Sequence, residues 1–301
     1  MEDLTRVLER SISSNQTDQN EAVKYIQEFC QKDFVGFIQA LSDVLYDQQN
    51  QPVVRAAAGL QLKNQLTARD EHLRHQQQER WRALPESTRA HIKDRVFKSL
   101  GTEIFRPWSA PQCVAYIALI ELPEQQWPGL IPALAANVTD TTSNQQLKLA
   151  SLEAIGYICQ DIDQTCIQAS DSKHILDAIV LHGIRDDECE EVKRAATTAL
   201  LSLYETKVHQ VSKLHQNVSF AQLGDLLNIE PQYAEKIIAQ MIREERIQGH
   251  LNQIDGTVHF ESKDILQVFD EEILKLCSEV NHIVEKIKVV VPDQWWSSST
   301  N

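Results

Sequence analysis

The chain has 301 residues, of which 42% are hydrophobic and 24% are charged, so disorder over its whole length is excluded. Its 43 acidic and 29 basic side chains give a net charge of −14, which disfavours binding to nucleic-acid backbones and anionic membrane surfaces. With only 9 Gly and 9 Pro, it lacks the turn residues that an all-β fold needs about every eight to twelve positions. We therefore expect a mostly helical protein whose partners are other proteins.

No segment of the chain has the pattern of a membrane helix or a signal peptide. The longest apolar run, Cys113 to Ile120, is far shorter than the roughly 20 residues needed to span a bilayer. The first ten residues, MEDLTRVLER, are charged and amphipathic. We expect a protein of the cytoplasm and nucleus. The cysteines show no paired spacing, which predicts reduced and mostly buried thiols: Cys30, Cys113, Cys159, Cys166, Cys189 and Cys277.

Apolar residues spaced by three and four predict a series of helices over the first two thirds of the chain. A capping box of Asp18 and Glu21 is expected to begin the second helix, and Pro52 to open the fourth. A polar stretch rich in Gln, Arg and His interrupts the pattern. The predicted helices cover residues 4–12, 18–30, 34–45, 52–66, 86–100, 111–121, 130–140, 144–161, 174–185 and 190–203.

Pairs of these helices recur about every 40 residues, which is the period of HEAT-type arrays. Roughly five units fit residues 1–205, and each pair buries its inner face only by stacking on its neighbours. An array that ends at its fifth pair exposes a few hundred Å² of apolar surface, at a cost of roughly 10 kcal/mol. We expect something to cover that face.

Long strings in this part resemble the amino-terminal repeats of importin-β. They are AAGLQLKNQLTARD, QQERW, SLGTEIFRPWSAPQCVAYIALIELPEQQWPGLIPALAANVTD and LASLEAIGYICQDID. The resemblance implies an all-α HEAT-type solenoid that acts in nuclear import by binding the small GTPase Ran in its GTP form. The cargo-bearing later repeats of that family are missing, so cargo transport is not implied.

The resemblance places Ran binding on the segment from Gly59 to Leu66, where Lys63 and Asn64 carry polar groups suited to a GTPase surface. Leu60 and Leu62 are expected to pack inside the array. The alternative is that Lys63 is a solvated helix residue and Asn64 bonds locally.

The segment ILDAIVLHGIR resembles an outer helix of the family's grooves for the Phe-Gly repeats of nucleoporins. Leu176 and Val180 lie one turn apart on it. Such a groove needs the next repeat as its second wall, and the resemblance ends near Leu203, so we expect the groove to be incomplete. Nucleoporin binding would place the chain at the nuclear envelope.

A winged helix is predicted over residues 206–262. Ser219 is the expected N-cap of a first helix with an apolar face, Pro231 opens a second, and HLNQI and TVHFE form a hairpin through Asp255-Gly256, where both turn residues take positive φ. The predicted apolar residues of the two helices are Phe220, Leu223, Leu226 and Leu227, then Ala234, Ile237, Ile238, Met241 and Ile242.

The exposed face of the second helix has no basic excess, which argues against DNA binding. Its charged residues are Glu235, Lys236, Arg243, Glu244, Glu245 and Arg246.

A helix over residues 263–288 carries a heptad seam, and residues 289–301 form a tail. The seam favours a bundle with other chains, although the helix folding back on its own winged helix is the alternative. The seam residues are Leu266, Phe269, Ile273, Leu276, Val280, Ile283 and Ile287.

Residues 209–293, including VSKLHQNVSFAQLGDLLNIEPQYAEKIIAQMI and GHLNQIDGTVHFES, resemble the end of COP-nine signalosome subunit four, a PCI-domain scaffold. The resemblance implies contacts with other PCI subunits of this deneddylation complex through the terminal helix. The helical repeats that normally precede the winged helix are absent, and the tail differs.

The sequence shows no phosphate-binding loop and no nucleophile elbow, so we predict no enzyme activity and no cofactor. His72 and His75 beside Glu71 are expected to be solvated, so no metal site is predicted. The pair Trp295-Trp296 is given no role.

Three interpretations remain, all non-enzymatic: a Ran-binding transport module, a signalosome scaffold, or a mis-joined fusion of two reading frames. The two resembling segments meet near residues 203–209 without a Gly/Ser or Pro linker, which favours a junction produced by splicing of two coding sequences.

Overall fold

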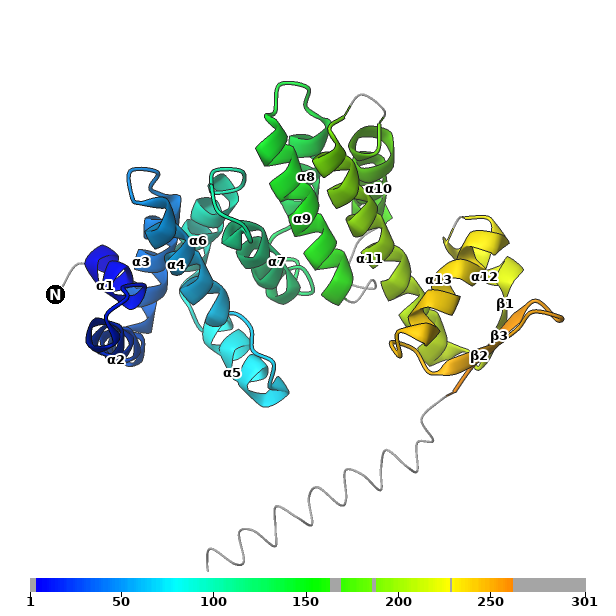
Figure 1. The fold of residues 1–301 in the computed structure, drawn as a ribbon, viewed down its shortest axis with the longest axis horizontal. Helices are drawn as coiled ribbons and strands as arrows, with labels where there is room; N and C mark the ends of the chain where they lie inside the picture. The colour runs from blue at the N-terminus through cyan, green and yellow to red at the C-terminus, as the bar shows by residue number, and fades with distance from the viewer. Residues whose placement is uncertain (1–3, 163–168, 186–187, 228, 262–301) are drawn as a thin grey trace, which may run out of the picture. The chain divides into compact units, whose positions relative to one another are not determined.

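The computed structural model describes residues 4–162, 169–185, 188–227 and 229–261 (Figure 1). The chain divides into two compact units, Met1–Lys207 and Val208–Asn301. Over the described ranges, no helix is both long enough and apolar enough to span a bilayer.

The first unit consists of helices joined by short connections, as the apolar periodicity predicts. Its helices are α1 (Leu4–Ser11), α2 (Gln16–Lys32), α3 (Phe34–Tyr46), α4 (Pro52–Asn64), α5 (Glu71–Arg82), α6 (Glu86–Lys98), α7 (Ser109–Glu121), α8 (Leu130–Thr139), α9 (Gln145–Asp161), α10 (Ala169–Leu176), the π-helix η2 (Asp177–Gly183) and most of α11 (Glu190–Leu214). The last turns of α11 belong to the second unit.

Consecutive helices pack in pairs, and alternate helices stack on one another. α3 packs against both α4 and α6, while α4 packs on α7 and α7 on α9. Gly59 permits the close approach of α4 to α7, since a Cβ atom there would lie 1.8 Å from Ser109 Oγ. The row α4, α7, α9 therefore forms one continuous layer whose helix ends share an edge.

One helix start and one whole helix differ from the prediction. α2 begins at Gln16, because the Asn15 side chain accepts a hydrogen bond from the Thr17 N–H at 2.9 Å and acts as the cap. The predicted capping box of Asp18 and Glu21 is therefore wrong, and Glu21 pairs with Arg10 instead. The polar stretch, for which periodicity predicted no helix, contains α5, in which only Gln77 and Trp81 are buried.

The end of the first unit also differs. The helix predicted over 174–185 is divided between α10 and η2, where the Ile184 N–H bonds to Ile179 O at 3.0 Å. α11 continues to Leu214, well beyond the predicted end at 203, and passes through the predicted domain boundary at 205/206.

The second unit has the helix, helix and hairpin order of a winged helix. It contains β1 (Asn217–Ser219), α12 (Phe220–Leu227), α13 (Pro231–Arg243), β2 (Gly249–Asn252) and β3 (Thr257–Phe260). The antiparallel sheet has the order β1-β3-β2, and its first strand was not predicted. Val218 and Val258 pair in the register of this sheet and are buried.

Side chains at the start of α12 fit the prediction closely. Ser219 Oγ accepts from the Gln222 N–H at 3.2 Å, and Gln222 Oε1 accepts from the Ser219 N–H at 3.1 Å, which is a capping box. Leu226 is 56% exposed, so its predicted place in the apolar face is wrong. In the hairpin turn Gly256 has φ of +63°, whereas Asp255 does not take positive φ.

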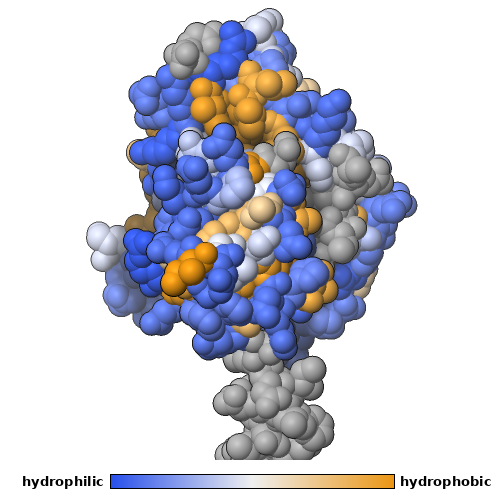
Figure 2. All heavy atoms as spheres, turned by 90° about the vertical axis from the view of Figure 1, so that its right-hand side faces the viewer, coloured by the Kyte–Doolittle hydropathy of each residue, from blue (hydrophilic) through white to orange (hydrophobic). Residues whose placement is uncertain are grey.

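Seen from the side shown in Figure 2, the surface is mostly hydrophilic, with apolar side chains gathered in separate patches. Tyr233 and Ile254 are among the exposed apolar residues of the second unit. The predicted helix over 263–288, its seam and the tail over 289–301 lie outside the described residues.

Candidate protein-binding site

A groove of about 850 Å³ lies between α5 and the carboxyl-terminal ends of α4, α7 and α9, and we call it the α5 groove. It is the point where the shared edge of the stacked layer meets the polar helix α5. Its lining residues are Lys63, Asn64, Leu66, Thr67, Ala68, Arg69, Arg74, Gln78, Tyr116, Leu119, Pro123, Asp161 and Ile162.

The two residues predicted to bind Ran lie together in this groove. Both belong to the last turn of α4, where Lys63 is half-buried and Asn64 is exposed. Leu62 beside them is fully buried, as predicted, but Leu60 is 49% exposed, so its predicted packing role is wrong. The reason is that α4 buries only the side that faces α3 and α7, and Leu60 lies away from it.

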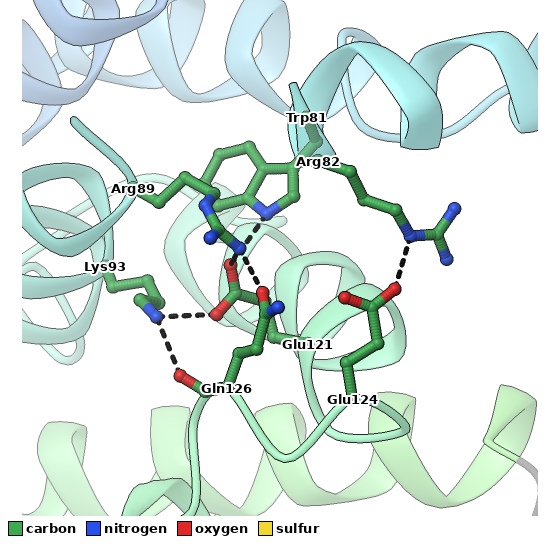
Figure 3. A network of polar contacts seen from close by, with 7 residues as sticks. All are labelled: Trp81, Arg82, Arg89, Lys93, Glu121, Glu124 and Gln126. Atoms are coloured by element: carbon green, nitrogen blue, oxygen red, sulfur yellow. Dashed lines mark hydrogen bonds and ion pairs between the residues drawn. The ribbon is translucent and has the colours of Figure 1, made fainter. Parts of the chain in front are cut away.

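α5 is held in place by a buried carboxylate (Figure 3). Glu121, at the end of α7, is fully buried and accepts from Trp81 Nε1 at 3.0 Å, Arg89 at 2.8 Å and Lys93 Nζ at 2.5 Å. Arg89 and Lys93 come from α6, and each also contacts Gln126. The network therefore ties α5, α6 and α7 to one point.

A second, more exposed contact acts on the same helix. Arg82 at the end of α5 pairs with Glu124 at 2.6 Å, and both side chains are about a third exposed to solvent. In addition, Gln77 Nε2 donates to the backbone oxygen of Asn64 at 2.6 Å, which joins α5 directly to the end of α4. These contacts fix the wall of the groove that α5 provides.

Positive charge predominates among the groove residues. Lys63, Arg69 and Arg74 are cationic, and Asp161 is the carboxylate among the lining residues. Burial raises the pKa of Asp161 above its ordinary value, and Arg74 acts in the opposite direction. The pKa of Tyr116 is also raised, first by burial and then by the charge of Asp161.

Sequence reasoning missed Arg69, Arg74, Tyr116 and Asp161 as neighbours of Lys63. A signal was present, since the helices ending at Asn64, Glu121 and Asp161 alternate with others in the predicted pairs. Alternate helices of a stacked array end at one edge, so their last turns are brought together. The sequence did not predict α5, because this helix has no apolar stripe.

The residues predicted for nucleoporin binding lie at the other end of the first unit. Leu176 ends α10 and is half-buried against the core, whereas Val180 lies in η2 and is 47% exposed. Leu181 and Ile184 are exposed beside it. π-Helical turns occur often at functional sites, but these residues alone form an apolar surface rather than a groove.

Four of the six cysteines lie within the described ranges, whereas Cys166 and Cys277 lie outside them. Cys113 and Cys159 are buried free thiols, and burial raises the pKa of Cys159 to about 12, which makes it unreactive. Cys30 and Cys189 are half-buried. No group of three metal-ligating side chains is found among the described residues. The heptad seam from Leu266 to Ile287 lies outside them.

Comparison with protein families separates the chain into two parts. The importin-β N-terminal domain model matches residues 22–102, which contain the predicted Ran-binding turn of α4. The PCI domain model matches residues 182–262, which contain most of α11 and the winged helix. The chain thus has one segment similar to each of two families. Both resemblances predicted from the sequence are thereby confirmed.

Curated relatives divide in the same way. Importin subunit beta-1 of Arabidopsis thaliana is 31% identical over 199 residues, 66% of this chain and 23% of the relative. Importin subunit beta-1 of Schizosaccharomyces pombe is 34% identical over 200 residues, with the same coverage. COP9 signalosome complex subunit 4 of Drosophila melanogaster is 44% identical over 100 residues, 33% of this chain and 24% of the relative. The chain thus spans about a quarter of the length of the relatives it matches.

Solved structures show the importin-β likeness in three dimensions. A crystal structure of importin beta has a TM-score of 0.62 and 27% identity, over 80% of this chain and 29% of that one. Yeast Kap95p in complex with RanGDP has a TM-score of 0.65 and 26% identity, over 81% of this chain and 29% of that one. The Kap95:Nup1 complex has a TM-score of 0.60 and 25% identity, over 80% and 27%. The predicted solenoid fold is confirmed for the first unit.

Proposed function

We propose that the chain is a non-enzymatic interaction module whose first unit binds the small GTPase Ran in its GTP form. The observation that carries the proposal is the placement of Lys63 and Asn64 together in the α5 groove, within the segment matched by the importin-β N-terminal domain. Their charged and amide groups can pair with the polar surface of a folded partner. The likeness to Kap95p bound to Ran supports the same partner.

The proposed organisation assigns this role to residues 1–205, a PCI-type winged helix to 206–262, a bundle helix to 263–288 and a tail to 289–301. Because the chain spans about a quarter of its importin relatives, cargo binding is not part of the proposal. We propose that this module acts in the cytoplasm and the nucleus.

The test is capture of the purified full-length chain by immobilised Ran loaded with GTP or GDP at near-physiological salt. Lys63→Ala combined with Asn64→Ala is expected to weaken GTP-selective binding about tenfold or more, because a charged hydrogen-bonding group is worth roughly 1.5–3 kcal/mol. Lys24→Ala with Asn20→Ala, two exposed positions on α2, is the matched control. Unchanged binding by the variant with both α4 substitutions would contradict the assignment of Lys63 and Asn64. Equal capture by Ran in both nucleotide states would contradict the proposed GTP-selective binding.

A second candidate function is scaffolding in a signalosome-like complex. It is favoured by the PCI match and by the 44% identity to COP9 signalosome subunit 4. The proposed contact is the heptad seam, so Ile273→Glu with Val280→Glu is expected to abolish co-purification with PCI subunits. Assembly that survives both changes would count against this function. Capture by neither Ran nor PCI subunits would favour the mis-joined fusion.

Nucleoporin binding through Leu176 and Val180 is proposed as a weak additional contact, since the Kap95:Nup1 complex is among the similar structures. Val180→Glu is expected to abolish capture by a Phe-Gly repeat peptide, with Lys173→Glu in α10 as the control because that side chain is exposed. Equal capture by the two variants would exclude the contact.

A further inference from the structure

The charge of the α5 groove stands out in a chain whose net charge is −14. Three cationic side chains, Lys63, Arg69 and Arg74, face one carboxylate, Asp161, among the lining residues. We infer that the α5 groove binds an acidic segment of a protein partner, with Lys63, Arg69 and Arg74 pairing with its carboxylates. The inference rests on the proposed Ran binding and names the chemistry of the segment that Ran would present.

The three cations are available to an incoming ligand. Within the described ranges, neither Lys63 nor Arg69 forms an ion pair. Arg74 approaches Glu71 at 3.9 Å, but the Glu71 side chain is 91% exposed, and such surface pairs contribute little. Arg74 also acts on the charge of Asp161, although within the described part of the chain no ion pair joins the two side chains. An acidic ligand would therefore compete with one internal carboxylate for one of the three cations.

The helix dipoles account for only part of this charge. Lys63 lies in the last turn of α4, where the helix dipole favours a positive charge. Arg74 lies near the amino-terminal end of α5, where the helix dipole opposes a positive charge. Asp161 is the internal carboxylate that acts on Arg74. One carboxylate does not balance three cations, and an acidic partner would supply the remaining negative charge.

The shape of the groove suits a short segment of protein. Its volume of about 850 Å³ exceeds that of a single side chain, and the partly exposed Tyr116, Leu119 and Pro123 give it some apolar surface beside the cations. A partly enclosed site lowers the local dielectric constant and strengthens each ion pair. A segment in which acidic residues alternate with apolar ones complements both features.

The net charge distinguishes among occupants. Two copies of this chain, each at −14, repel one another, and a nucleic acid with its dense phosphates is repelled more strongly. A protein segment that carries a few carboxylates on an otherwise balanced surface experiences mainly the local field of the groove within a Debye length of about 10 Å. The acidic protein segment is the occupant to which we commit.

The experiment measures binding of the full-length chain to two probes by fluorescence anisotropy. One probe is Ran loaded with GTP, and the other is a labelled hexapeptide Glu-Leu-Asp-Glu-Leu-Glu, compared with the same peptide carrying Gln and Asn in place of its acidic residues. The test variant is Arg69→Glu with Arg74→Glu. The control is Lys24→Glu with Lys173→Glu, which makes the same change in net charge at two exposed positions outside the groove.

The test variant is expected to weaken binding of both probes about tenfold at low salt, with a smaller difference at high salt because screening reduces both. The control is expected to change binding less than about twofold. Asp161→Asn, which removes the opposing carboxylate, is expected to tighten binding of both probes. Circular dichroism establishes that each variant is folded.

The outcomes separate the inference from the proposed function. If GTP-selective Ran binding persists in the test variant and the peptide binds no differently from its neutral counterpart, the inference is overturned while the function stands. If Ran fails to bind the parent chain but the acidic peptide binds and the test variant loses it, the function fails and the groove chemistry stands. Failure of both probes on the parent chain overturns both.

Discussion

Glu121 concentrates more polar contact than any other side chain described above. It is fully buried and is surrounded by an indole N–H, a guanidinium and an ammonium group from α5 and α6. Its partners lie 28 to 40 residues away in the sequence. A sequence shows the acidic residue at the end of a helix but not the donors, because they are brought to it only when the array stacks.

We expect Glu121→Ala to lower the free energy of unfolding by about 3 to 5 kcal/mol, because it leaves two cations partly buried without their carboxylate. Urea denaturation should show a lower midpoint with an unchanged slope. Glu124→Ala removes the neighbouring, solvent-exposed pair with Arg82 and is expected to cost less than about 1 kcal/mol. Equal losses from the two substitutions would contradict the assigned role.

Asp161 predicts a pH dependence of stability. Its folded-state pKa is raised above the ordinary value of 3.8, so the folded chain binds this proton more strongly than the unfolded chain does. The ionised carboxylate therefore destabilises the fold at neutral pH, and this cost disappears as the pH falls through the raised folded value to below 3.8. Asp161→Asn should be more stable than the parent at pH 7, with the difference vanishing near pH 3. Parallel pH profiles would show that the pKa is not raised.

At the scale of single elements, sequence periodicity predicted most of the helices, because their stability comes from burying an apolar stripe. It failed where that stripe is absent or altered. α5 buries only Gln77 and Trp81, so its place in the array depends on polar contacts that no local pattern reveals. The apolar run of the helix predicted over 174–185 was correctly found. Its π-helical part, η2, was not predicted, because its amino-acid composition does not differ from that of an α-helix.

The candidate site shows the same division between what local sequence determines and what packing determines. Lys63 and Asn64 were found through a family resemblance that spans the last turn of α4. Arg74 and Asp161 were not found, because their proximity depends on the stacking of α4, α7 and α9 and on α5 lying across the ends of that layer.

Two glycines in the outer helices of the row α4, α7, α9 should respond oppositely to replacement by Ala. A Cβ at Gly59 would lie 1.8 Å from Ser109 Oγ and 2.6 Å from Ser109 Cβ, which forces α4 and α7 apart. We expect Gly59→Ala to destabilise the chain by about 1 to 3 kcal/mol or more. At Gly156 the nearest atom would be 3.5 Å away, so Gly156→Ala should be neutral or stabilising by up to about 1 kcal/mol. Thermal melting of the two variants would decide, and a loss at Gly156 as large as at Gly59 would contradict the packing.

At the scale of the whole molecule, the chain divides into two compact units, and its two ends are similar to two different families. The two divisions do not fall at the same residue, because α11 lies in the segment matched by the PCI model but belongs mostly to the first unit. The interaction chemistry is correspondingly divided between a cationic groove in the first unit and the predicted seam.

Glu121 and Ser219 belong to separate groups of contacts, which predicts additive stability effects. Ser219→Ala removes the capping box of α12 and should cost about 1 kcal/mol. Since Ser219 and Glu121 share no contact partner, the loss in the double variant should equal the sum of the single losses within about 0.5 kcal/mol. Denaturant titrations of the two single variants and the double variant measure the difference. A coupling energy above 1 kcal/mol would contradict this expectation.

The buried carboxylate has a consequence for how related chains can diverge. Removing Glu121 leaves two partly buried cations without their carboxylate, and removing Arg89 or Lys93 leaves the carboxylate with fewer compensating charges, so each single substitution produces a destabilised variant. Replacement of the whole group by apolar residues of similar volume carries no such penalty. In homologous arrays these three positions should therefore covary. Such covariation would reveal a contact that the periodicity of a single sequence does not show.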